Sequence, residues 1–403
     1  MYDYIIIGGG ISGLYCALEL LKNNKDIDIV LCEKYKTVGG RISTFQKDDM
    51  RWEAGAGRVS TNHTMFLALL KKYKHTLIPI EGNTMYKDKS NCLEEDFFEK
   101  TIDAYIKPLK LLDPSFLANF TVKELLTKIH GKEVAEYYLD CFPYRAEVEV
   151  LRADLGIKTL CSEMGPKEEY VVSKQGLSDV IEHMKDEFLD GGGKILYNYE
   201  CIDIKANDTI SVEFLNGSRK ILEGKKVLCA MESEALKKIP YFSNWSVLKH
   251  LRMEPLLRTY AVYDTRWFSQ LPKIVTPGPI RYFIPVNYEK GISMVSYTDS
   301  RDTIGFHTIL KKFGEASLGK HIQNLLRKLF GKVPEYSFFK SHYWKYGATY
   351  WLPGNYDPVE ESKKSLKPFG EEVYVVGESF SLKQAWVEGA LEQSKKLFDT
   401  YRI

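Results

Sequence analysis

The sequence lacks several features that would define a class of protein. It has no CxxC pair and no Cys/His cluster with metal-ligand spacing, and its seven cysteines are widely spread over 403 residues. These cysteines predict reduced thiols, and no metal site is expected. No run of about 18 apolar residues is present, so no membrane anchor is expected. A strand-like run directly after Met1 leaves no room for a signal peptide, so we expect a soluble, cytoplasmic protein.

The chain also lacks an excess of charge of either sign. Its 56 Lys and Arg residues balance 54 Asp and Glu residues, and the formal net charge is +2. This balance gives no electrostatic reason to expect nucleic acid as a partner. The 44% hydrophobic and 13% aromatic composition is that of an ordinary globular protein that can also line a pocket. The length suits two domains, and a small molecule is the expected ligand.

The first 33 residues contain the pattern of a dinucleotide-binding fold. The segment "YDYIIIGGGISGLYCALELLKNN" predicts a strand, a tight turn and a helix. Gly8, Gly10 and Gly13 match G-x-G-x-x-G, whose glycines allow the turn, the approach of a pyrophosphate and helix–strand packing, respectively. The next strand, "DIDIVLCEK", ends in Glu33, where an acid accepts hydrogen bonds from a ribose. The region therefore predicts an α/β, Rossmann-type domain.

Two further motifs carry a resemblance to a known family. G-G-R at Gly39, Gly40 and Arg41 brings more backbone amides and a cation toward the same diphosphate. With the turn "EAGAGRVS" and the terminal segment "VYVVGESFSLKQAWVEGALEQS", the sequence resembles the flavin-containing amine oxidase family from residue 2 to nearly residue 400. The resemblance implies a GR2-like FAD-binding domain and a second, mixed α+β substrate domain.

The resemblance also implies how FAD is held. In the family, the residue matching Cys201 offers backbone groups to the adenine, and the pair matching Gly377 and Glu378 contacts the ribityl chain and diphosphate. Around "HYWKYGATYWLPG" no cysteine occupies the place where some relatives attach FAD covalently, so we expect dissociable FAD. The residues expected to bind it are Gly8, Gly10, Ile11, Ser12, Gly13, Glu33, Lys34, Gly39, Gly40, Arg41, Gly55, Ala56, Gly57, Arg58, Cys201, Gly377, Glu378, Trp386 and Val387.

The rest of the chain divides between the two domains. Helical spacing dominates residues 61 to about 165, and strands dominate residues 246 to about 346, around a helix at "IGFHTILKKFGEASLGKHIQNLLRKLFG". Between them, "KILYNYECIDI" predicts one strand, and Asn216-Gly217 predicts a hairpin turn. We expect the FAD-binding domain at 1–60, 165–245 and 347–403 and the substrate domain at 61–164 and 246–346.

Within the family, the motifs are closest to the L-amino-acid oxidase branch. There, the arginine of a G-x-x-R turn, here Arg58, pairs with the substrate carboxylate, helped by a tyrosine matched by Tyr297. Trp386 matches the tryptophan of "GWIEGA"-type sequences, and Ala385 replaces their glycine. The implied reaction oxidises the CH–NH2 group of a primary amine or L-amino acid to an imine. O2 is the expected acceptor and H2O2 the product.

Arg258 departs from the family pattern, and it leaves alternatives open. Relatives commonly have a lysine in this strand, bridged by water to flavin N5, but arginine does not shed its proton. A slow oxidase, a dehydrogenase with another acceptor, or a flavoprotein with little or no turnover would each be consistent with Arg258. A mutase or desaturase of the same fold is a further alternative, although G-G-R and "WVEGALEQS" argue against a mutase. The expected catalytic residues are Arg258, Trp386 and Tyr297, and the expected substrate-binding residues are Arg58, Tyr297, Trp386 and Ala385.

Overall fold

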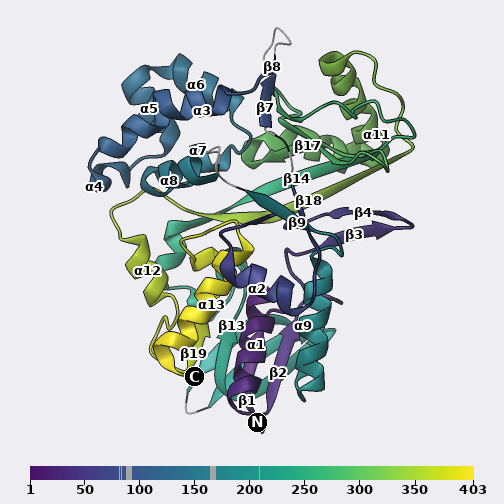
Figure 1. The fold of residues 1–403 in the computed structure, drawn as a ribbon. Coiled ribbons are helices and arrows are strands. Elements are labelled where there is room, and N and C mark those ends of the chain that lie inside the picture. Colours follow the sequence, from purple (N-terminus) through teal and green to yellow (C-terminus); the bar gives the residue numbers. More distant parts are fainter. Residues whose placement is uncertain (81, 83, 88–92, 164–168, 208) are drawn as a thin grey trace.

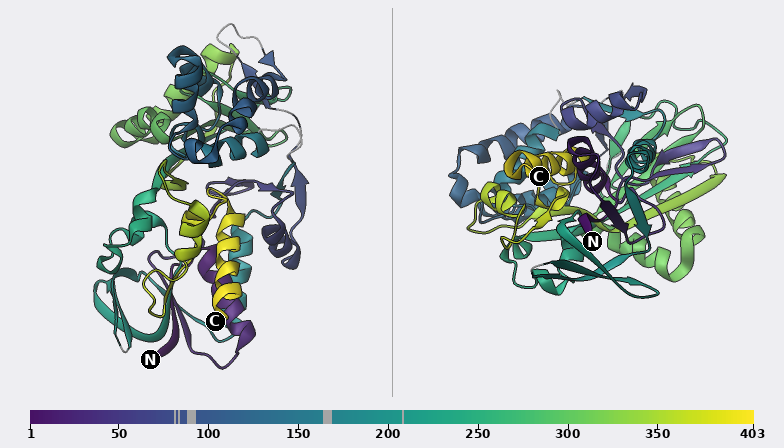
Figure 2. Two further views of the ribbon diagram at one scale, coloured as in Figure 1. Left: turned by 90° about the vertical axis from the view of Figure 1, so that its left-hand side faces the viewer. Right: turned by 90° about the horizontal axis from the view of Figure 1, so that it is seen from below.

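The structure is a computed structural model that describes residues 1–403 apart from 81, 83, 88–92, 164–168 and 208. Two seven-stranded sheets belong to two lobes stacked along the long axis of the molecule (Figures 1 and 2). Both termini lie at the end of the lobe that contains the first sheet (Figure 1). The α/β fold class with a second, mixed sheet is confirmed. The division into domains at the stated residues stays a prediction, and its boundary at 164/165 touches residues outside the described part of the chain.

The first sheet has a parallel core, in the order β10-β2-β1-β13-β12-β11 with β19 beside β13. Its strands are β1 (Tyr2–Ile7), β2 (Ile29–Glu33), β10 (Lys194–Tyr197), β11 (Glu200–Ala206), β12 (Ile210–Asn216), β13 (Ser218–Cys229) and β19 (Val373–Val375). Helices α1 (Ile11–Asn23), α9 (Ser178–Asp190) and α13 (Val387–Tyr401) share one apolar cluster with Ile6, while Ile5 and Ile7 face the opposite cluster. Burial on both faces explains the continuous apolar run of β1.

One prediction for this sheet, the hairpin turn, is confirmed, and another, a single long strand, is wrong. The hairpin turn is confirmed, since Gly217 has a φ of 65° and joins β12 to β13. The single strand over "KILYNYECIDI" is wrong, because Asn198 has a φ of 63° and separates β10 from β11. Asparagine tolerates this left-handed conformation, so the chain turns at a residue that is not glycine, and the sequence pattern does not indicate the turn.

The second sheet has the order β18-β14-β17-β16-β15-β7-β8, and β14 and β18 run across the middle of the molecule (Figure 1). Its strands are β7 (Thr84–Lys87), β8 (Leu93–Glu94), β14 (Leu251–Val262), β15 (Lys273–Val275), β16 (Tyr282–Asn287), β17 (Ile292–Asp299) and β18 (Phe338–Trp351). The expected long helix is α11 (Thr303–Phe330), which packs on this sheet and kinks at Gly314.

Short helices make up most of the stretch expected to be helical. They are α2 (Thr64–Lys72), α3 (Phe97–Thr101), η1 (Ile102–Ile106), η2 (Lys107–Leu111), α4 (Pro114–Leu117), α5 (Val122–His130), α6 (Lys132–Cys141), α7 (Ala146–Glu149) and α8 (Ala153–Glu163). Gly131, with a φ of 87°, separates α5 from α6 where the apolar spacing is continuous. The group from α3 to α8 lies on one side of the second lobe and α11 on the other (Figure 1).

The remaining elements are short strands and helices. A hairpin of β3 (Thr44–Lys47) and β4 (Met50–Glu53) precedes a three-stranded sheet of β5 (Val59–Ser60), β9 (Tyr170–Ser173) and β6 (Leu77–Pro79), in that order. The other helical elements are α10 (Ser233–Leu236), η3 (Pro240–Phe242), η4 (Ser246–His250), η5 (Ser300–Asp302), α12 (Pro358–Lys364) and η6 (Glu378–Phe380). Because β5 pairs with β9, the chain just after Arg58 lies beside Tyr170.

Two expectations about the environment of the chain bear on this structure. Across its described residues, no helix is long and apolar enough to cross a membrane. The six cysteines in the described part of the chain are free thiols, and the seventh, Cys92, lies outside it. The cytoplasmic location stays a prediction.

Candidate functional site

A large cavity gathers nearly all the residues predicted to carry function. It has a volume of about 1960 Å³, whereas a pocket for a drug-sized ligand has about 300–1,000 Å³. Its walls come from the carboxyl ends of β1 and β2, from the "EAGAGRVS" turn and from the second sheet. Of the residues predicted to bind FAD, bind substrate or act in catalysis, all but Gly13 line this cavity. Their roles remain predictions.

Each glycine of the G-x-G-x-x-G motif has a different environment. A Cβ atom on Gly13 would lie 2.0 Å from the carbonyl oxygen of Gly8, so Gly13 serves the packing of α1 on β1 and lies behind the cavity. A Cβ atom on Gly10 would meet no atom within 4 Å. The space in front of Gly10 therefore belongs to the cavity, and a ligand can approach the backbone closely there.

Two helices begin at the cavity without a capping side chain among the described residues. Gly10 is the N-cap of α1 and Trp386 is the N-cap of α13, and both residues line the cavity. The first N–H groups of a helix have no partner within the helix, and the helix dipole attracts negative charge to this end. Two such termini suit the anionic groups of a dinucleotide.

A third helix N-terminus, that of α2, differs from these two because the side chain of Glu388 accepts hydrogen bonds from its first N–H groups. This buried carboxylate, two residues after Trp386, accepts hydrogen bonds of 2.9 Å from the N–H groups of Met65 and Phe66. It thereby caps α2 and fixes α13 against the segment that follows the "EAGAGRVS" turn. The sequence gives no reason to assign this role to Glu388.

Buried Glu33 joins the two glycine motifs at the end of β2. Its carboxylate accepts hydrogen bonds from the N–H groups of Gly9, at 2.7 Å, and Tyr35, at 2.9 Å. The N–H of Gly39 donates to the carbonyl of Gly9 at 2.8 Å. Lys34 forms an ion pair with Glu200 at 2.6 Å, beside Cys201 on β11. The acid, the turn and the G-G-R segment are thus held as one unit.

Arg41 and Glu378 connect the G-G-R motif to the C-terminal motif. Arg41 Nη1 lies 2.8 Å from Glu378 Oε2, and Glu378 is buried. The same carboxylate accepts hydrogen bonds from the N–H groups of Thr349, at 3.1 Å, and Ala385, at 2.7 Å. Ala385 has a φ of 66°, in the left-handed region that an L-residue with a Cβ atom occupies at a cost. This backbone conformation is the physical reason for the glycine that the resemblance implies at this position.

Replacing Ala385 with glycine should therefore stabilise the protein. We expect Ala385→Gly to raise the free energy of unfolding by about 0.5–1 kcal/mol, because relief of the left-handed strain exceeds the added chain entropy of glycine. Lys320→Gly, in the exposed interior of α11 beyond its kink, is the control and should lower it by about 0.5–1 kcal/mol. Denaturant midpoints measure both effects, and destabilisation by both substitutions would contradict the assigned strain.

Aromatic rings surround Arg58. Its guanidinium carbon lies 4.2 Å from the ring centroid of Tyr170, 5.2 Å from that of Trp386 and 5.4 Å from that of Tyr144. The rings of Tyr170 and Trp386 are nearly parallel, with centroids 5.9 Å apart. His63 packs edge-on against Trp386 at 4.8 Å, and burial, with the nearby charges of Lys383 and Arg58, lowers its pKa to about 4. Arg58 is therefore a positioned cation beside a neutral imidazole.

A second cation, Lys273, lines the same cavity as Arg58. Burial and the charge of Arg58 lower the pKa of Lys273. The sequence analysis did not predict a role for Lys273, Tyr144 or Tyr170, because each lies in a segment without a recognisable motif.

Tyr297 lies beside Arg258, and Tyr144 contacts both Tyr297 and Arg58. Arg258 and Tyr297 are register partners on β14 and β17, and the guanidinium carbon of Arg258 lies 5.5 Å from the ring centroid of Tyr297. The ring of Tyr144 contacts both Arg58, at 5.4 Å, and Tyr297, at 5.4 Å. Burial raises the pKa of Tyr297 well above its usual value, so its hydroxyl stays protonated.

Arg258 holds the backbone of the "EAGAGRVS" turn. Its Nη1 donates to the carbonyl of Gly55, while the hydroxyl of Tyr260 donates to the carbonyl of Glu53 at 2.7 Å. Trp344 Nε1 donates to the carbonyl of Ala54 at 2.7 Å. Arg258 Nε is buried and has no hydrogen-bond partner among the described residues, although Arg258 lines the cavity. A ligand or water in the cavity would satisfy it.

Comparison with known proteins points to one family. The model of the family described as flavin containing amine oxidoreductase matches residues 11–396. An L-amino-acid oxidase of Sistrurus catenatus edwardsii is 28% identical over 149 residues, which cover 37% of this chain and 26% of that protein. A flavin-containing amine oxidase of Danio rerio is 36% identical over 73 residues, which cover 18% of this chain and 14% of that protein. The matched regions thus span about a quarter or less of these curated relatives.

Solved structures show the same fold over the whole chain. The structure of putrescine oxidase bound to putrescine aligns with a TM-score of 0.79 at 16% sequence identity and covers 100% of this chain and 99% of that one. A triple mutant of putrescine oxidase aligns with a TM-score of 0.77 at 17% identity, over 99% and 98% of the two chains. At this identity the likeness concerns the fold.

Proposed function

The chain belongs to the flavin-containing amine oxidoreductase family, and from that premise we propose that it oxidises an L-amino acid to the imine, with FAD as cofactor. The observation that carries the choice of substrate is the placement of Arg58, whose guanidinium three aromatic rings hold in the wall of the cavity that the dinucleotide motifs and Lys273 also line. A simple amine has no group for these cations to bind. An α-carboxylate would bind to them, and a bidentate contact would fix the orientation of the amino acid in the cavity.

The residues of the cavity fit FAD. The N-termini of α1 and α13 have no side-chain cap in the described part of the chain, and the space in front of Gly10 is open, which suits the diphosphate and the flavin ring of FAD. Glu33 lies where its carboxylate could accept hydrogen bonds from a ribose. When bound, FAD supplies the acceptor for the hydride of the amine-bearing carbon. We propose that it binds without a covalent bond.

The protein's own residues have three tasks in this reaction. Arg58 and Lys273 hold the carboxylate, and the rings of Trp386, Tyr170 and Tyr144 keep the Arg58 guanidinium in place. The aromatic wall excludes water from the reacting carbon. The positive charges also lower the pKa of a bound amine, which favours the unprotonated form that can give up a hydride.

Arg258 supports a second candidate function, a dehydrogenase or a flavoprotein that reacts slowly with O2. Its guanidinium donates to the Gly55 carbonyl, and arginine, unlike lysine, does not serve as a proton acceptor in proteins. Arg258 therefore braces the turn and cannot take the part of a titrating lysine. In this case the substrate would still reduce the flavin, but O2 would reoxidise it slowly.

A stepwise flavin assay separates these functions. The purified protein is mixed without oxygen with L-amino acids, monoamines and polyamines, and L-phenylalanine is paired with its decarboxylated analogue phenethylamine. We expect flavin bleaching by at least one L-amino acid and not by its decarboxylated analogue. Peroxide formation after oxygen is admitted identifies an oxidase, and slow colour recovery identifies a dehydrogenase. Bleaching by dithionite alone, with no amine effective, would contradict amine oxidation and favour a mutase or a flavoprotein without turnover.

A further inference from the structure

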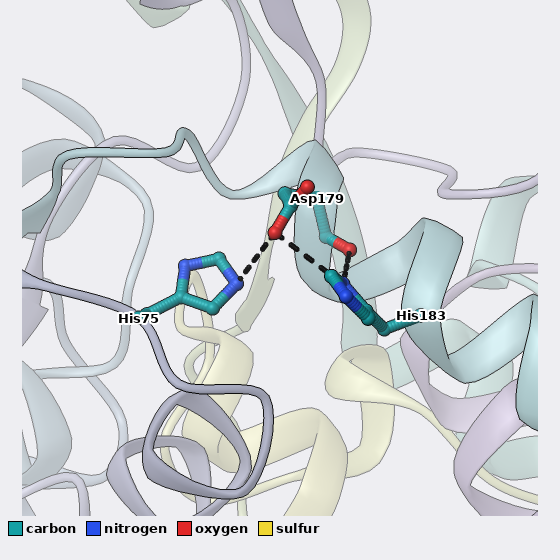
Figure 3. Close-up of side chains that lie close together, drawn as sticks. All are labelled: His75, Asp179 and His183. Carbon is teal, nitrogen blue, oxygen red and sulfur yellow. Dashed lines mark hydrogen bonds and ion pairs between the residues drawn. The ribbon is translucent and has the colours of Figure 1, made fainter.

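Three metal-ligating side chains meet outside the cavity, between segments far apart in the sequence (Figure 3). They are His75, Asp179 and His183, and one potential ligand atom from each lies within 4.8 Å of the other two. None of the three lines the cavity described above. We propose that they bind a divalent transition-metal ion such as Zn²⁺, which clamps the loop after α2 onto α9.

The backbone fixes both sides of this cluster. Asp179 lies in the first turn of α9 and His183 lies four residues further, so the helix presents them on one face. His75 follows Lys74, whose φ of 58° turns the chain at the end of α2. The N–H of His75 donates to the carbonyl of Leu70 at 2.8 Å. The loop is therefore anchored to α2 while its imidazole points toward α9 (Figure 3).

The loop is also tied to the chain that leads into α9. The N–H of Lys174 donates to the carbonyl of Thr76 at 2.9 Å, and the N–H of Thr76 donates to Gln175 Oε1 at 3.0 Å. These bonds do not depend on the three candidate ligands. A site held on both sides in this way loses little conformational freedom when an ion binds.

The separations between the ligand atoms match those around a small ion. Asp179 Oδ2 lies 3.1 Å from His75 Nε2 and 3.3 Å from His183 Nδ1. Four ligands at about 2.0–2.1 Å in a tetrahedron around Zn²⁺ lie about 3.3–3.4 Å from one another. Two of the three distances between ligand atoms therefore already match those around a bound ion. The third distance, between the ligand nitrogens of His75 and His183, is at most 4.8 Å, and rotation of the His183 ring, which is 49% exposed, would shorten it.

His75 supplies an independent sign of a ligand. Its side chain is fully buried, and Nε2 has no hydrogen-bond partner among the described residues although it lies 3.1 Å from Asp179 Oδ2. The two atoms are close enough for an ion pair, but the contact does not meet the geometry of a regular hydrogen bond. A metal-binding nitrogen has this geometry, because its lone pair points at the ion and not at the neighbouring ligand atom. His75 Nδ1, 2.6 Å from Ser173 Oγ, has the outer hydrogen bond that orients a ligating imidazole.

His183 must exchange one bond when the ion binds. Its Nδ1 lies 2.8 Å from the carbonyl oxygen of Asp179, and its ring stacks on Tyr73 at 5.3 Å. The stack keeps the ring near the site while Nδ1 turns toward the ion. Two imidazoles and one carboxylate suit Zn²⁺ and its transition-metal neighbours better than Mg²⁺ or Ca²⁺, which prefer oxygen.

Zinc titration of the untagged, full-length, FAD-loaded protein tests the proposal. After EDTA treatment and buffer exchange, we expect calorimetry to show one saturable Zn²⁺ site per chain and the melting temperature to rise, because the ion binds only the folded chain. MgCl2 should give neither effect. His183→Ala and Asp179→Asn should weaken Zn²⁺ binding about 100-fold or more, beyond the 10–100-fold that loss of an outer-shell partner costs.

His321→Ala is the matched control, because His321 is an exposed histidine on α11 away from the cluster. It should bind Zn²⁺ as the unchanged protein does. The proposal is overturned if the unchanged protein shows no saturable site, if His183→Ala binds Zn²⁺ equally well, or if His321→Ala loses the site. Because His183 and Asp179 are solvent-accessible side chains, their variants are expected to fold, and the FAD content of each variant verifies this.

Discussion

Replacement of Gly10 by valine should remove FAD from the protein without unfolding it. A Cβ atom at this position meets no protein atom within 4 Å, so the side chain would project into the cavity at the N-terminus of α1. It would occupy the space through which a diphosphate reaches the backbone N–H groups. Losing these charge-assisted hydrogen bonds should weaken FAD binding about 100-fold or more. FAD is measured in the supernatant after acid precipitation, where a dissociable cofactor is released.

Two other glycines provide the controls for this experiment. Gly305 is exposed on α11, and a Cβ atom there also meets no atom within 4 Å, so Gly305→Val should retain FAD. Gly13→Ala would place its Cβ atom 2.0 Å from the Gly8 carbonyl oxygen and should reduce the yield of folded protein instead. Circular dichroism separates loss of cofactor from loss of fold. Full FAD content in Gly10→Val would show that α1 does not hold the diphosphate, and yellow colour left in the acid pellet would show a covalent bond.

Replacement of Arg58 by alanine should separate amino acids from simple amines. The variant would lose the bidentate contact to the carboxylate that we propose for Arg58, so we expect kcat/KM for the best L-amino acid to fall about 100-fold or more, equivalent to about 3 kcal/mol. The decarboxylated analogue should change less than about threefold, because it makes no such contact. Rates of anaerobic flavin bleaching measure both substrates on one protein preparation.

The surroundings of Arg58 determine the controls. Removing a cation from the rings of Tyr170, Trp386 and Tyr144 costs about 0.5–2 kcal/mol of stability, so FAD content and melting temperature are measured as well. Arg58→Lys keeps the charge but not the planar fork, and it should recover part of the lost activity. An equal loss with both substrates would show that Arg58 braces the cofactor site and does not bind the carboxylate.

Sequence patterns predicted the parts of the site that depend on neighbouring residues. The spacing of Gly8, Gly10 and Gly13 after a short apolar strand, and the acid at Glu33, required a turn, a helix start and a second strand. These features follow from backbone sterics over a few residues. The cofactor motifs could therefore be read before any contact was known, and nearly all of them line the cavity.

Local breaks in regular structure were harder to predict. The apolar spacing continues through Gly131, and strand-forming residues continue through Asn198, yet both residues adopt a positive φ and end their elements. A single left-handed residue changes the direction of the chain without changing the pattern around it. Propensity and periodicity are averages over a window, so they do not register such a residue.

The sequence alone determined the cofactor motifs, the α/β class and the presence of an arginine in the "EAGAGRVS" turn. The fold alone decided what surrounds that arginine. Pairing of β5 with β9 brings Tyr170 beside Arg58, and the packing of α9 on the loop after α2 brings His183 toward His75. These contacts join residues more than a hundred positions apart, and they arise from burial of apolar surface by whole elements. No local pattern encodes them, because each side chain is placed by the element that carries it.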